Sequence, residues 1–155
     1  SRVRRQRQMC IRDRIKTKCD ILFLEGWCCG SSEIPKKILH KNINNLEKIK
    51  DPKYQWRNFY NNKLKLEYKK LFKLFDELIF LKTSSFDNVF KWRLKQEKTN
   101  QSKNKKSKRM TSNEIKYFVQ HYEKITKWMM KDLNKKAQIV IKFEKNHKIS
   151  SINFN

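Results

Sequence analysis

Three short apolar runs constrain the fold of this 155-residue chain more than any other feature of its sequence. They cover residues 19–24, 78–81 and 137–141, and each is nearly continuous rather than alternating. Such a run is typical of a parallel strand that is buried on both faces. The stretches between the runs are long enough for helical crossover connections. The sequence therefore predicts an α/β fold, in which a parallel sheet is flanked by helices.

Helical periodicity occupies the stretches between these runs. Residues 54–75 and about 85–97 each carry one apolar side, and residues 38–49 predict a helix or a pair of turns. A longer helix follows Met110, because Thr111-Ser112-Asn113-Glu114 is a capping box. Its core side is predicted to consist of Ile115, Phe118, Val119, Tyr122, Ile125, Met129 and Leu133.

Residues 98–109 separate the last two of these helices. The segment contains six basic residues and neither an acidic nor an apolar one. Because such a segment offers nothing to a hydrophobic core, it is predicted to be a mobile basic surface loop.

Composition excludes several classes of protein. A mean hydropathy of -0.94 and 35% charged residues exclude a membrane protein, and no apolar run reaches the roughly 20 residues that span a bilayer. The chain has two glycines, Gly26 and Gly30, so it contains neither G-x-G-x-x-G nor the phosphate-binding G-x-x-x-x-G-K-[ST]. The net charge of +24 would ordinarily indicate nucleic acid or an anionic membrane as a partner.

The distribution of the basic residues weakens that interpretation. Six of the nine arginines lie within residues 1–14, whereas all 30 lysines follow them. Residues 4–14 resemble the translation of a transposon-based sequencing adapter, so we expect residues 1–14 to be a non-native scar. The later lysines occur together with Asn, Ile, Phe and Tyr, and all of these residues have AT-rich codons. A low-GC genome therefore explains much of the basic charge without phosphate binding. A genuine basic N-terminal arm is the alternative.

The cysteines and the N-terminal sequence indicate the cellular compartment that is expected for the protein. Cys19, Cys28 and Cys29 show no C-x-x-C spacing, so a zinc site is not expected. No signal peptide is recognisable, which predicts reduced thiols and a cytoplasmic protein. Organellar targeting stays open if an N-terminal part has been lost.

Polar residues at the strand ends are the first candidates for a functional site. In parallel α/β sheets, ligands bind beyond the carboxyl ends of the strands. Glu25 directly follows the first predicted strand, and Gly26 allows the backbone to turn close to a ligand. Glu25 is therefore the strongest candidate, and the alternative is that it caps the next turn. Lys82 ends the second strand and is a weaker phosphate-binding candidate.

A charged residue on the helix predicted for residues 85–97 is the second candidate. Arg93 shares the apolar side of that helix with Phe86, Val89 and Phe90, so its charge needs a partner or an anionic ligand. An i,i+4 pair with Glu97 is an equally good interpretation of the spacing.

Several motifs together resemble one known family. They are Ile-Leu-Phe-Leu-Glu-Gly-Trp-Cys at 21–28, Ile-Phe-Leu-Lys at 79–82, Phe-Lys-Trp-Arg-Leu-Lys-Gln-Glu at 90–97, Met-Thr at 110–111 and Phe-Val-Gln-His-Tyr at 118–122. In order and separation they resemble the P-loop kinase family that contains D-glycerate 3-kinase. The resemblance implies a P-loop NTPase-type three-layer fold, a parallel sheet flanked by helices. Residues 15–155 would be its C-terminal portion, without the phosphate loop.

The resemblance also implies roles for individual residues. Glu25 would serve magnesium, through a water, or the acceptor, and Trp27 and Lys82 would contact the substrate. Arg93, with residues 98–109 as a lid, would approach the transferring phosphates, and Asn146, His147 and Lys148 would lie near the adenine. The cofactors expected for the intact parent are ATP and Mg²⁺. Ser31 and Ser84 depart from the family pattern, which leaves the acceptor open.

The function expected from all of this is ATP-dependent phosphorylation of a small hydroxy acid, with D-glycerate as the expected acceptor. Without the phosphate loop, this chain alone is expected to be inactive. A basic nucleic-acid-binding module is one alternative, and a catalytically inactive scaffold of the same fold is another. The aromatic residues fall on core sides of helices and the lysines are scattered, so we expect neither a nucleic-acid nor a membrane partner.

Overall fold

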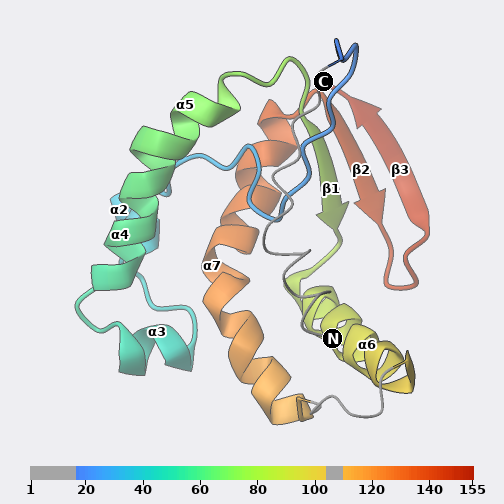
Figure 1. Cartoon of the computed structure of the whole chain (residues 1–155). Coiled ribbons are helices and arrows are strands. Elements are labelled where there is room, and N and C mark those ends of the chain that lie inside the picture. The colour runs from blue at the N-terminus through green and yellow to red at the C-terminus, as the bar shows by residue number, and fades with distance from the viewer. Residues whose placement is uncertain (1–16, 104–109) are drawn as a thin grey trace.

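The structure is a computed structural model, and it describes residues 17–103 and 110–155. The described chain combines helices and strands in an α/β fold (Figure 1). The elements are α2 (Lys36–Leu39), α3 (Asn45–Lys50), α4 (Gln55–Lys63), the π-helical η1 (Leu64–Tyr68), α5 (Lys69–Phe72), β1 (Ile79–Thr83), α6 (Phe86–Lys103), α7 (Ser112–Lys136), β2 (Ile139–Phe143) and β3 (Ile149–Phe154).

The described strands form one small mixed sheet in the order β1-β2-β3. β1 and β2 are parallel, with Ile79 opposite Ile139, and they confirm the second and third predicted strands. β3 is antiparallel to β2 and was not predicted from the sequence. The two serines in Ile149-Ser150-Ser151-Ile152 interrupt its apolar residues, so it lacks the continuous run that marks the other two strands. The α/β class is confirmed, but the sheet is not purely parallel.

The prediction of a strand at residues 19–24 is wrong for the described structure. These residues form no β-pairs, and the side chains of Ile21, Leu22, Phe23 and Leu24 are 71%, 82%, 82% and 54% exposed. An apolar run indicates a tendency to be buried, but a strand also requires a neighbour for its backbone hydrogen bonds. Within the described residues no strand pairs with this segment.

The predicted helices are present, with two differences in extent. The helix predicted for residues 54–75 appears as α4, η1 and α5 in succession, and residues 38–49 contribute to the two short helices α2 and α3. α6 runs to Lys103, so residues 98–103 are helical rather than part of a loop. These residues include neither Gly nor Pro, and therefore nothing in them ends the helix. The remainder of the predicted loop, residues 104–109, lies outside the described residues.

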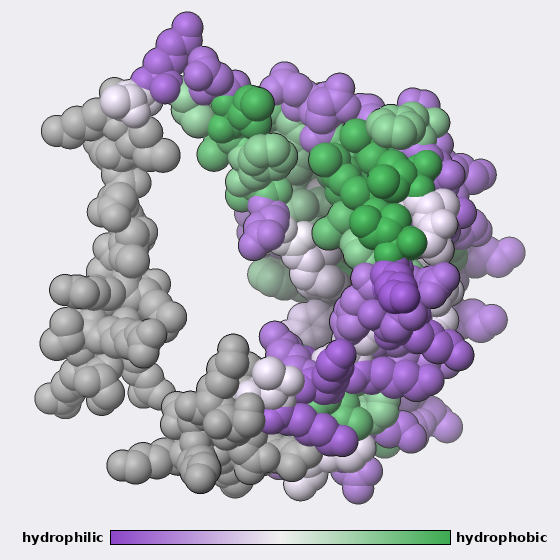
Figure 2. Space-filling view, turned by 90° about the vertical axis from the view of Figure 1, so that its right-hand side faces the viewer, coloured by the Kyte–Doolittle hydropathy of each residue, from purple (hydrophilic) through white to green (hydrophobic). Residues whose placement is uncertain are grey.

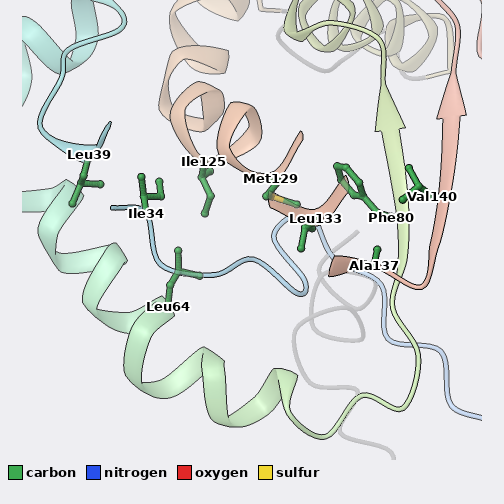
Figure 3. Close-up of a cluster of buried hydrophobic side chains, with 9 residues drawn as sticks. All are labelled: Ile34, Leu39, Leu64, Phe80, Ile125, Met129, Leu133, Ala137 and Val140. Atoms are coloured by element: carbon green, nitrogen blue, oxygen red, sulfur yellow. The ribbon is translucent and has the colours of Figure 1, made fainter. Parts of the chain in front are cut away.

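α7 stands at the centre of the core (Figure 3). Ile125, Met129 and Leu133 of this helix are at most 6% exposed. They lie between Ile34, Leu39 and Leu64 on one side and the sheet residues Phe80 and Val140 on the other (Figure 3). The cluster consists of Ile34, Leu39, Leu64, Phe80, Ile125, Met129, Leu133, Ala137 and Val140. Despite the length of α7, no described helix is long and apolar enough to span a bilayer.

The predicted capping box at the start of α7 is confirmed. The Oγ1 of Thr111 accepts a hydrogen bond from the backbone N–H of Glu114 at 3.2 Å, and the Glu114 carboxylate accepts one from the N–H of Thr111 at 2.7 Å. Thr111→Ala should therefore lower the free energy of unfolding by about 1 kcal/mol. Urea unfolding measures the loss, with Ser112→Ala as the control. Equal stability of the two variants would contradict this role.

Candidate active site

One row of side chains on α7 organises the candidate site. Phe118 and Tyr122 are one turn apart, and their ring centroids are 5.0 Å apart. The ring of Trp27 meets Tyr122 edge-on at 4.7 Å, and its Nε1 donates a hydrogen bond to Oγ1 of Thr126 at 3.0 Å. We call Trp27, Tyr122 and Phe118 the aromatic row. It fixes the Glu25-Gly26-Trp27 segment to the side of α7.

Arg93 lies at the other end of the aromatic row. Its guanidinium carbon is 5.8 Å from the ring centroid of Phe118, and its Nη1 donates to Oε2 of Glu97 at 2.6 Å. The ion pair with Glu97, one of the two interpretations of the spacing, is thus present in the structure. The Arg93 side chain is still 26% exposed, so it can be reached from solvent. The structure therefore brings Trp27 and Arg93 onto one side of α7.

Glu25 is exposed and makes no hydrogen bond or ion pair within the described part of the chain. The turn that follows it is closed by backbone bonds, from Cys29 N–H to the Gly26 carbonyl at 3.4 Å and from Ser31 N–H to the Cys28 carbonyl at 3.1 Å. Glu25 therefore does not cap this turn, and the capping interpretation is not observed. Its carboxylate is left available to a ligand.

The two glycines shape this turn. A Cβ at Gly26 would lie 2.7 Å from the Sγ of Cys29. Gly30 has a φ of +78°, and a Cβ there would lie 2.6 Å from Cδ2 of Leu78. Gly30 therefore disfavours any side chain, whereas a side chain at Gly26 would require the Cys29 thiol to move. The backbone between Glu25 and the first residue of the core, Ile34, is held close to α7 and to the start of β1.

The expected magnesium role of Glu25 can be tested against the ligands nearby. Magnesium binds through one or two carboxylates together with waters and substrate phosphates. Glu25 offers a suitable oxygen donor, but the described residues contain no group of three or more His, Cys, Asp or Glu side chains able to hold a metal ion. The magnesium role of Glu25 therefore stays a prediction.

Lys82 is not part of the aromatic row. Its Nζ donates to Oδ1 of Asn134 near the end of α7 at 2.8 Å. Burial lowers the pKa of Lys82, and the neighbouring Lys142 lowers it further. The structure thus directs Lys82 toward the covering helix rather than toward Trp27 or Arg93.

The residues expected near the adenine occupy the turn between β2 and β3. His147 has a φ of +65°, and its ring stacks on Trp92 of α6 with centroids 4.5 Å apart. Nε1 of Trp92 donates to the Lys145 carbonyl at 2.9 Å, and Oδ1 of Asn146 accepts from the Lys148 N–H at 3.0 Å. The turn is therefore fastened to α6, one residue away from Arg93. Sequence reasoning identified the turn but not Trp92 as its anchor.

A polar cluster at the carboxyl end of β1 was not predicted in detail. Nδ2 of Asn88 donates to Oγ1 of Thr83 at 3.2 Å and to Oγ of Ser84 at 2.9 Å. Thr83 in turn donates to the Ser85 carbonyl at 3.1 Å. Asn88 is 1% exposed, and its Oδ1 has no hydrogen-bond partner within the described structure. The signal in the sequence is the polar Thr83-Ser84 pair after a buried strand, although nothing local distinguishes Asn88.

These elements define an α/β protein in which one long helix places Trp27 and Arg93 at the two ends of an aromatic row. The same fold occurs in D-glycerate 3-kinase from Cryptococcus neoformans var. grubii serotype A, with a TM-score of 0.67, 19% sequence identity, and coverage of 91% of this chain and 52% of that chain. The solved YGR205w protein gives a TM-score of 0.53, 22% identity, and coverage of 83% of this chain and 45% of that one.

These similarities confirm the expected resemblance to a glycerate 3-kinase-like fold. The chain spans about half the length of each of the two structures. No protein-family model matches the sequence, and no curated protein matches it.

Proposed function

We propose that this chain is part of an ATP-dependent kinase that phosphorylates a small hydroxy acid, with D-glycerate as the acceptor. The fold that it shares with D-glycerate 3-kinase over 91% of its length carries this proposal. We further infer that the complete fold is a P-loop NTPase-type three-layer one. The chain has no phosphate loop of its own, because its two glycines cannot form one. Phosphoryl transfer depends on positioning and charge stabilisation, so this chain alone should be inactive.

The position of each residue relative to the aromatic row suggests its role in the proposed reaction. Arg93 lies at one end and remains partly exposed, so that its guanidinium can face the charge that develops on a transferring phosphoryl group. Glu25 lies two residues before Trp27, and its available carboxylate binds the acceptor hydroxyl or a magnesium-bound water. The turn with Asn146, His147 and Lys148 lies beside α6 and contacts the adenine. ATP supplies the phosphoryl group when it is bound.

Glu25→Gln tests this proposal in a chimera. Residues 15–155 are joined to the part of the Cryptococcus D-glycerate 3-kinase that lies outside the matched half. The variant should lower kcat for ATP-dependent phosphorylation of D-glycerate at least tenfold, which is about 1.4 kcal/mol in the barrier. Its melting temperature should not change, because Glu25 is exposed and unpaired within the described residues. Glu67→Gln is the control, since Glu67 pairs with Lys63 away from the aromatic row.

Three results would contradict the proposal. The first is turnover of Glu25→Gln close to that of the unsubstituted chimera. The second is a folded chimera that does not phosphorylate D-glycerate. The third is tight oligonucleotide binding by the chain that weakens steeply as salt rises, which would instead favour the nucleic-acid alternative.

A further inference from the structure

A cavity of about 580 Å³ lies between α5, the last turns of α7 and the segment that follows Gly30. We call it the α5–α7 cavity, and its volume is typical of pockets that bind small molecules. It lies at the end of the molecule where β1 begins, whereas α6 and the start of α7 lie at the opposite end (Figure 1). Asp132 in its wall follows Phe118 of the aromatic row by 14 residues, which is about 21 Å along the helix. The cavity is therefore distinct from the candidate active site.

One wall of the α5–α7 cavity is aromatic and is held in place by hydrogen bonds. The indole Nε1 of Trp128 donates to Oγ of Ser32 at 3.3 Å, and this hydroxyl donates to Oδ2 of Asp132 at 2.6 Å. Phe72 lines the cavity together with Trp128, and both side chains pack against the core cluster. Two fixed aromatic side chains offer a planar apolar group a surface on which to pack.

The charged side chains of the cavity do not balance one another. Those in its lining are Glu33, Lys69, Lys73, Asp132 and Lys136. Asp132 and Lys136 neutralise each other, because Nζ of Lys136 lies 2.8 Å from Oδ1 of Asp132. Within the described residues, no hydrogen bond or ion pair involves the side chains of Glu33, Lys69 or Lys73. Two lysines and one carboxylate leave the cavity with one positive charge in excess.

The two unpaired lysines are arranged to act together. Lys69 begins α5, and Lys73 directly follows its last residue. Side chains four residues apart lie on the same side of a helix, and both of these line the cavity. The two oxygens of one carboxylate can therefore each accept a hydrogen bond from one ammonium group.

We propose that the α5–α7 cavity binds a small aromatic carboxylate. The ring lies against Trp128 and Phe72, and the carboxylate accepts hydrogen bonds from Lys69 and Lys73. One negative charge on the ligand matches the one positive charge that the cavity has in excess. The proposal does not depend on the kinase activity, because none of these side chains belongs to the candidate active site.

NMR of the isotope-labelled chain of residues 1–155 tests the proposal, with naphthylacetate as the probe. The indole N–H of Trp128 is the reporter, since it donates to Ser32 in the wall of the cavity. Its signal should shift to a saturating value as naphthylacetate is added. Naphthylethanol and naphthylethylamine carry the same ring with no charge and with a positive charge. Both should bind at least ten times more weakly.

The exposed apolar surface of the sheet is the main competing site for an aromatic compound. Ile152 and Phe154 are 49% and 77% exposed, and Figure 2 shows hydrophobic residues gathered on the side of the molecule that carries β3. Binding there would shift the amide signals of β3 and would not distinguish the acid from the alcohol. The indole signals of Trp27 and Trp92 report on the aromatic row and on the turn between β2 and β3. Neither should move.

A matched pair of double variants locates the carboxylate. Lys69→Gln combined with Lys73→Gln should weaken the binding of naphthylacetate at least tenfold. Lys65→Gln combined with Lys70→Gln removes the same charge from η1 and α5 but outside the lining of the cavity, and should leave the affinity unchanged. Because all four lysines are exposed, both double variants should keep the melting temperature of the unsubstituted chain.

Four outcomes would overturn the proposal. They are a Trp128 signal that does not shift to saturation, equal affinities for naphthylacetate and naphthylethanol, equal weakening by the two double variants, and shifts of Trp27 or of the β3 amides in place of Trp128. Since each readout is binding to the chain, an inactive kinase chimera would contradict the proposed function and leave this cavity's role unaffected.

Discussion

Arg57→Met is expected to lower the free energy of unfolding by about 3–5 kcal/mol. Arg57 is fully buried, and its Nε donates to Oδ2 of Asp51 at 2.8 Å. Its Nη1 lies 3.3 Å from Oε2 of Glu47, and its Nη2 donates to the Asp51 carbonyl at 2.6 Å. Methionine fills much of the same space but leaves two buried carboxylates short of a partner. An uncompensated buried charge is among the most destabilising single changes known.

Lys124 extends this network to α7. Its Nζ lies 3.2 Å from Oε2 of Glu47, and it donates to the carbonyls of Ile38 and Lys41 at 3.1 and 2.6 Å. Burial lowers the pKa of Lys124, whereas Glu47 opposes that shift. Burial raises the pKa of Tyr60, and the nearby Glu47 raises it further. The network thus connects α3, α4 and α7, and its loss should affect the whole helical side of the protein.

Urea unfolding at pH 7 measures the effect of Arg57→Met. The control is Lys63→Met, which removes an exposed i,i+4 pair with Glu67 and should cost less than about 1 kcal/mol. Arg57→Lys should also destabilise the fold, because a single ammonium cannot reach the same set of acceptors as a guanidinium. A loss for Arg57→Met no larger than that for Lys63→Met would show that the carboxylates find other partners.

The local features of this fold could be predicted because they depend on neighbouring residues. The capping box of Thr111 and Glu114 involves two side chains three residues apart, and the strands β1 and β2 each begin with three consecutive apolar residues. The buried charge network could not be predicted in the same way. Lys124 lies 77 positions from Glu47 along the chain, and charged residues are ordinarily exposed.

Local sequence patterns are equally limited at residues 19–24 and at the candidate site, because both depend on contacts between distant residues. The apolar run correctly indicates a surface that prefers burial, but its pairing depends on a neighbouring strand that no local pattern supplies. Glu25 and Arg93 were both found as candidates. The link between Trp27 and Arg93 through Phe118 and Tyr122 was not predicted, because these two residues appeared as part of the core side of α7. In the structure both are only partly buried, which makes room for Trp27 and Arg93.

Leu133→Ala is expected to lower the free energy of unfolding by about 2–5 kcal/mol. Leu133 is 1% exposed and belongs to the core cluster that includes Leu64 on the helical side and Phe80 and Val140 on the sheet (Figure 3). Removing its side chain both forfeits buried apolar area and leaves a cavity between these two groups. Because neighbours on both sides are held by other contacts, they should not collapse fully into the space.

The comparison that isolates this effect is Leu74→Ala. Leu74 is 76% exposed, so its truncation should change stability by no more than about 0.5 kcal/mol. Both variants should unfold in one transition with the same dependence on urea as the unsubstituted chain, which would assign the difference to the native core rather than to the unfolded state. If Leu133→Ala were no less stable than Leu74→Ala, α7 could not be the element that joins the sheet to the helices. The aromatic row, which is built on the same helix, would then lack the rigid support that the candidate site requires.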